Sequence, residues 1–170
     1  MKKSILMITL CAIVAFSTTS CKEEEKTGSE ILSGAKNGWK LTLAVSTPAY
    51  EMSNGTEVSD LIAGFLEDCE RDDIMYFQST NAQIVNPGKD KKTTNADYDC
   101  VEMTEKSLGN WALTEDEKSF SSFYLPYFPG DKFSIAETEI VTLNETTLTV
   151  KVAVRDGVND VNFALTYTKQ

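Results

Sequence analysis

The residue types that could carry out chemistry are unevenly represented in this chain of 170 residues. It contains 26 aspartates and glutamates and four cysteines but no histidine. The missing histidine removes the commonest general base, and with it Ser-His-Asp and Cys-His nucleophile schemes and the usual zinc sites. Carboxylates stand close together at Asp72 and Asp73 and at Asp156 and Asp160. Neighbouring acids are typical of a solvated turn, and the spacing of a calcium-binding loop is absent. We therefore predict that the protein is not an enzyme and has neither a metal site nor a cofactor.

Cysteine is the other reactive residue type, and Cys21 marks a boundary in the chain. Before it, Lys2 and Lys3 form a basic start, and residues 5–16 form an apolar run. That run is shorter than the roughly 20 residues that span a membrane, and the pattern indicates a secretory signal. The small residues at 18–20 followed by Cys21 resemble the lipobox of bacterial lipoproteins, whose cysteine is diacylated and becomes the mature N-terminus. We predict a signal peptide over residues 1–20 and acyl chains on Cys21 that hold the protein firmly in a membrane. The alternative is a secreted protein cut near Ser20 with a free thiol at Cys21.

The stretch after the boundary predicts a flexible acidic tether over residues 21–36. It is rich in charged and small residues, which disfavour order. Such a tether of about 15 residues would reach on the order of 20 Å. The run Glu23-Glu24-Glu25 resembles the acidic tag of surface-exposed lipoproteins of certain Gram-negative gut bacteria, which implies an outer-membrane protein displayed on the cell surface. The alternative is a solvated linker with no role in export.

The charge balance limits the partners of the domain that follows. The formal net charge is −10, so the basic face that nucleic-acid binding requires is missing. The remaining residues, 37–170, are in the usual size range of a single domain. We therefore expect one domain that binds no nucleic acid.

The pattern of apolar residues predicts a chain of short strands with one early helix. Alternation over residues 39–45 indicates a first strand that ends before Pro48, and apolar residues at helical spacing indicate a helix over residues 58–69. Further strands are expected at 74–79, 98–101, 109–113, 120–125, 133–143, 148–155 and 161–168. Roughly eight strands joined by short connections favour an all-β fold, an antiparallel up-and-down barrel of about eight strands whose closure removes its edges.

Several of these features together resemble the lipocalin-like domains of bacterial lipoproteins, over about residues 32–169. They are the lipobox at Cys21, the tryptophan-led strand at Trp39, the segment Asp68-Cys69-Glu70-Arg71-Asp72-Asp73-Ile74, Cys100, the segment Gly109-Asn110-Trp111-Ala112-Leu113 and the segment Ile140-Val141-Thr142-Leu143-Asn144-Glu145-Thr146-Thr147-Leu148. The resemblance implies an up-and-down barrel of about eight strands, often with no established ligand.

A barrel of this size favours one of two functions. It can hold one small apolar or amphipathic ligand, and the candidate binding residues are its prominent aromatic residues. These are Trp39, Trp111, Phe123, Tyr124, Tyr127 and Phe128. In the alternative, the same rings are core, the barrel is filled, and the protein is structural or binds another protein.

The remaining cysteines predict a disulfide. If Cys11 is lost with the signal peptide and Cys21 is acylated, only Cys69 and Cys100 are left, and an exported protein meets an oxidising compartment. We therefore expect a bond between Cys69 and Cys100, with two buried reduced thiols as the alternative.

Overall fold

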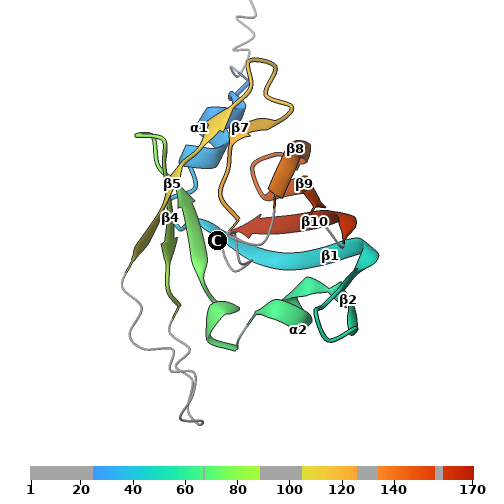
Figure 1. Ribbon diagram of the computed structural model, residues 1–170. Coiled ribbons are helices and arrows are strands. Elements are labelled where there is room, and N and C mark those ends of the chain that lie inside the picture. The colour runs from blue at the N-terminus through green and yellow to red at the C-terminus, as the bar shows by residue number, and fades with distance from the viewer. Residues whose placement is uncertain (1–24, 67, 89–104, 126–133, 156–158) are drawn as a thin grey trace, which may run out of the picture.

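The computed structural model describes residues 25–66, 68–88, 105–125, 134–155 and 159–170 (Figure 1). Its helices are α1 (Gly28–Ser33), α2 (Leu61–Phe65) and a 3₁₀ turn, η1 (Asp68–Glu70). Its strands are β1 (Trp39–Glu51), β2 (Glu57–Asp60), β3 (Ile74–Phe77), β4 (Ala82–Asn86), β5 (Lys106–Asn110), β6 (Ala112–Leu113), β7 (Phe120–Ser122), β8 (Ser134–Leu143), β9 (Thr147–Arg155) and β10 (Asp160–Lys169). Within these described ranges, no helix is long and apolar enough to cross a membrane.

The main sheet has eight antiparallel strands, which confirms the predicted all-β fold. Its strand order is β5-β4-β3-β1-β10-β9-β8, with β2 paired to β1. The first and last long strands therefore lie side by side, with Trp39 opposite Lys169. Figure 1 shows the sheet curling into a half-barrel, with α1 beside β7 at one end and α2 with β2 at the other.

A small hairpin approaches the far edge of this sheet. Strand β6 begins two residues after β5 ends, and it pairs with β7 in a separate two-stranded sheet. The hairpin reaches β8 through a bridge between Ser119 and Glu139 and a hydrogen bond of 2.7 Å from the Ile140 amide to the Lys118 carbonyl. The hairpin therefore connects the two edges of the half-barrel at the α1 end.

The core lies on the concave face of the sheet, where the predicted alternation of the last two strands is confirmed. Strands β9 and β10 pair without a register shift, from Asp160 opposite Arg155 to Thr168 opposite Thr147. Their inward side chains are at most 2 % exposed: Leu148, Val150, Val152, Val154, Val161, Phe163, Leu165 and Tyr167. Full burial of one such aliphatic side chain contributes about 1.5–3 kcal/mol, so this face accounts for a large part of the stability.

The predicted helix over residues 58–69 is wrong in its extent. Val58 lies in β2, and α2 begins only after Asp60, whose side chain accepts hydrogen bonds from the amides of Ile62 and Ala63. A capping aspartate fixes the helix start, so the residues before it cannot continue the helix. Leu66 is extended, with φ −86° and ψ 128°, and it ends α2 after five residues.

The first strand also differs from its prediction, because β1 continues through Pro48 to Glu51. Its pairing with β10 ends at Thr47, and its pairing with β2 is in register again at Tyr50. Proline lacks an amide donor, and here it falls in the interval between the two ladders. Strand β4 is missing from the prediction, and the strand expected at 98–101 lies outside the described residues.

The predicted tether over 21–36 is wrong for its second half, because residues 28–33 form α1. Thr27 and Glu30 form a capping box, in which each side chain accepts a hydrogen bond from the other residue's backbone. Leu32 is 1 % exposed, and its carbonyl accepts a hydrogen bond of 3.1 Å from Trp39 Nε1. The ordered fold therefore begins well before residue 37.

Candidate functional site

The two tryptophans proposed as ligand contacts lie in the core. Trp39 is fully buried and Trp111 is 3 % exposed. The indole N–H of Trp111 donates to the carbonyl of Gln78 at 3.0 Å, just as that of Trp39 donates to Leu32. Both polar atoms are thus satisfied within the protein, which leaves neither ring a donor for a ligand.

The remaining predicted aromatics separate into three groups. Phe123 packs against Phe120 in a tilted arrangement with a centroid distance of 4.7 Å, and both rings stack on Phe77. Tyr124 is 48 % exposed. The side-chain amide of the buried Gln83 holds the Tyr124 backbone: it donates a hydrogen bond to the Tyr124 carbonyl and accepts one from the Tyr124 N–H. Tyr127 and Phe128 lie outside the described residues. The structure therefore brings Trp111 and Phe123 together around Phe77, with the ring of Tyr124 exposed to solvent.

The cysteine and carboxylate candidates have structural partners where the structure describes them. Cys69 is buried and disulfide-bonded. Cys21 and Cys100 lie outside the described residues, so the pairing of Cys69 with Cys100 stays a prediction. Asp73 is 3 % exposed and accepts a hydrogen bond from the Gly88 amide at 3.0 Å. Asp160 forms an exposed ion pair with Arg155. Among the described residues no group of three or more metal-ligating side chains comes together.

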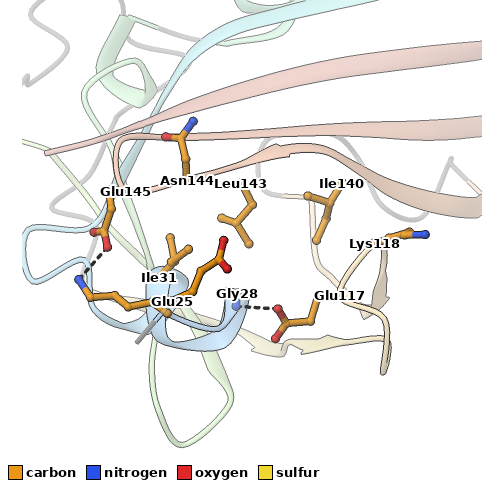
Figure 2. Close-up of a pocket in the computed structure, with 10 residues that line it drawn as sticks. Glu25, Gly28, Ile31, Glu117, Lys118, Ile140, Leu143, Asn144 and Glu145 are labelled. Carbon is orange, nitrogen blue, oxygen red and sulfur yellow. Dashed lines mark hydrogen bonds and ion pairs between the residues drawn. The ribbon is translucent and has the colours of Figure 1, made fainter. Parts of the chain in front are cut away.

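Among the described residues, a groove at the α1 end of the half-barrel is a candidate binding site. Its volume is about 490 Å³, and it lies between α1, the turn of the β6–β7 hairpin and the turn from β8 to β9 (Figure 2). It is lined by Glu25, Lys26, Gly28, Ile31, Glu117, Lys118, Ile140, Leu143, Asn144 and Glu145. The lining therefore combines three segments that are far apart in the sequence.

The floor of this groove is apolar and closely packed. Ile31, Ile140 and Leu143 are partly buried and pack against the core. Gly28 is buried between them and the hairpin, and a Cβ atom there would lie 3.0 Å from both Glu117 Oε2 and Leu143 Cδ2. The absence of a side chain at Gly28 is what allows α1 to approach the hairpin this closely.

Carboxylates dominate the rim, and two of the three are already engaged. Glu117 Oε2 accepts a hydrogen bond of 2.7 Å from the Gly28 amide. Glu145 pairs with Lys26 at 2.7 Å and with Lys169 at 3.5 Å. The hydrogen bond from Lys26, supported by the charges of both lysines, lowers the pKa of the Glu145 carboxyl, which is therefore ionised at neutral pH.

The third carboxylate and one ammonium group are available to a ligand. Glu25 and Lys118 are exposed and form no ion pair with the described residues. Figure 2 shows the Glu25 carboxylate over the middle of the groove and Lys118 at its far end. The groove thus offers one negative and one positive group above an apolar floor.

The sequence contains a signal for this site that the tether prediction missed. Thr27-Gly28-Ser29-Glu30 has the spacing of a capping box, and Ile31 and Leu32 follow it directly. That combination predicts a helix start with an apolar side. A second hollow, of about 260 Å³, lies against another face of the same helix, where Ser29, Glu30 and Ser33 meet Asn81 and Trp111.

Comparisons with protein-family models, with curated proteins and with solved structures found no match to this chain. The groove and its contacts are therefore the observations from which a function is inferred.

Proposed function

We propose that the protein is a lipid-anchored, surface-exposed outer-membrane lipoprotein with a lipocalin-like barrel that binds a small amphipathic molecule. The groove at the α1 end, with its partly buried isoleucines and leucine beneath a carboxylate rim, is the observation that carries this proposal. A volume of about 490 Å³ is within the range of small-molecule sites, which are largely apolar with a few polar groups. Binding occurs in this groove, and the tryptophans predicted as contacts contribute to the core.

The available carboxylate of Glu25 favours a ligand with a cationic group. Glu25 has no ion-pair partner among the described residues, and the chain as a whole is strongly acidic. A negative surface attracts cations and repels anions on approach. An alkylammonium ion, with its chain on the floor and its charge at Glu25, fits both features.

A second function, binding to another protein, is supported by a different observation. Trp39, Phe77, Trp111 and the inward residues of β9 and β10 belong to one continuous cluster of buried side chains. A filled interior of this kind serves as a scaffold, and contacts with a partner would then use exposed apolar side chains such as Val141, which is 57 % exposed.

Replacing Glu25 by glutamine tests the groove. We expect the Glu25→Gln variant to bind n-octylammonium about three- to fivefold more weakly than the wild type by isothermal titration, because one exposed ion pair contributes up to about 1 kcal/mol. Glu115→Gln is the matched control, since Glu115 is an exposed glutamate in the nearby β6–β7 hairpin and does not line the groove. Equal affinity of the wild type and both variants, or no binding at all, would contradict the proposed site.

Replacing Cys21 by alanine tests the anchor. We expect Cys21→Ala to move the protein from the membrane fraction to the soluble fraction, because acyl chains on Cys21 are the proposed attachment. Cys11→Ala, within the predicted signal peptide, is the control and should leave the protein in the membrane fraction. Continued sedimentation of Cys21→Ala with the outer membrane would show that the attachment lies elsewhere.

A further inference from the structure

We propose that the α1 groove binds the headgroup of an amine-bearing phospholipid, of the phosphoethanolamine type, from the same membrane that holds the anchor. This inference rests on the proposed function, because it names the ligand class of the proposed site. Three observations support it: the fixed position of residues 26–32, the small number of residues between that segment and Cys21, and the charges left available in the groove.

The segment that enters the domain is fixed to the wall of the groove. Lys26 pairs with Glu145 at 2.7 Å, and the next residue but one, Gly28, donates its amide to Glu117 at 2.7 Å. Leu32 is buried beneath them and is held by the indole of Trp39. Because these contacts surround the groove, the chain cannot move away from the groove without breaking them.

The chain between Cys21 and this fixed point is short. Five residue steps separate Cys21 from Lys26, and even a fully extended chain of that length spans only about 17 Å. The headgroup layer on each side of a bilayer is about 5–7 Å thick. An acylated Cys21 therefore keeps the groove at or near the membrane surface, where lipid headgroups are the most concentrated amphipathic molecules.

The groups left available in the groove match a zwitterionic headgroup with a primary amine. The ammonium group of phosphoethanolamine can donate a charge-assisted hydrogen bond to the Glu25 carboxylate, and its phosphate can approach Lys118. A choline headgroup carries the same charge but has no N–H donor. An anionic headgroup such as phosphoglycerol has no cationic group to pair with the Glu25 carboxylate, so the amine-bearing lipid is favoured over both.

The test uses the mature, acylated protein in lipid nanodiscs of equal parts phosphatidylethanolamine, phosphatidylcholine and phosphatidylglycerol. Native mass spectrometry of the released protein should show at least fivefold more bound phosphatidylethanolamine than either other lipid. Glu25→Gln should abolish this preference, and Glu115→Gln should retain it. A flexible Gly/Ser spacer of about 20 residues inserted after Cys21 should lower the occupancy several-fold, because it lowers the effective concentration of the headgroups at the groove.

The outcomes separate this inference from the proposed function. No preference among the three lipids, with n-octylammonium still bound in a Glu25-dependent way, would overturn the lipid assignment and leave the small-molecule site standing. A preference that survives Glu25→Gln would place lipid binding outside the groove and overturn the inference as well. Loss of both the lipid preference and the alkylammonium binding in the wild type would overturn the inference together with the proposed function.

Discussion

Replacing Trp39 by alanine is expected to lower the free energy of unfolding by about 3–5 kcal/mol, the range for truncation of a fully buried aromatic side chain. Trp39 is 0 % exposed and lies at the start of β1, between β10 and β3. Its indole N–H also holds the carbonyl of Leu32 in α1. The substitution would therefore leave a cavity in the core and release the helix that forms one wall of the groove. Urea denaturation followed by circular dichroism would measure the resulting loss in the free energy of unfolding.

Two further variants show which part of this effect comes from packing. Trp39→Phe keeps an aromatic ring but removes the N–H, and it should cost about 1–3 kcal/mol, as expected when a buried acceptor loses its donor. Leu43→Ala is the matched control on the same strand, because Leu43 is 50 % exposed and its truncation should change stability by less than about 0.5 kcal/mol. A Trp39→Ala variant with nearly unchanged stability but altered ligand binding would show that the ring lines a binding site, as the sequence first indicated.

The parts of the fold that could be predicted are those in which a local pattern and tertiary burial agree. In β9 and β10, every second residue is apolar and every one of these is buried, because both strands have one face on the core and one in solvent. The boundaries of Leu148 to Arg155 and Val161 to Thr168 were therefore predicted to within one residue.

The parts that could not be predicted depend on contacts between distant segments. The apolar spacing from Val58 to Cys69 suits a helix, but pairing of β2 with β1 draws Val58 into a strand, and Asp60 caps the short helix that remains. Helical spacing is a weak signal when a neighbouring strand offers backbone partners. Strand β4 has only five residues, and its buried Gln83 is polar, so its sequence lacks a strand pattern.

The candidate site was missed for the same reason. Ile31, Lys118 and Leu143 come from segments separated by more than 20 residues each, and only the docking of α1 beside the β6–β7 hairpin brings them together. Sequence reasoning instead selected conspicuous aromatic residues, and protein cores favour such rings because each one buries a large apolar surface. The observed roles of Trp39 and Trp111 follow from this preference.

Removing the disulfide is the other change with a large expected effect. Cys69 is disulfide-bonded, and we expect its partner to be Cys100. A bond between these two residues closes a loop of about 32 residues, which on the chain-entropy estimate restricts the unfolded state enough to stabilise the fold by about 3.7 kcal/mol. The double variant Cys69→Ser with Cys100→Ser should therefore melt about 10 °C lower than the wild type in a thermal scan.

The bond should matter most where the secondary structure is short. Cys69 lies in η1, a single 3₁₀ turn that joins the five-residue α2 to β3. Neither η1 nor α2 is long enough to be stable alone, so both depend on tertiary contacts and on this cross-link. Cys21→Ser is the control, and it should change membrane attachment without changing the melting temperature. The pairing is checked directly by mass spectrometry of peptides from the unreduced protein: a linked peptide containing Cys69 and Cys100 is expected, whereas free thiols at both residues, or Cys69 joined to another cysteine, would contradict the prediction.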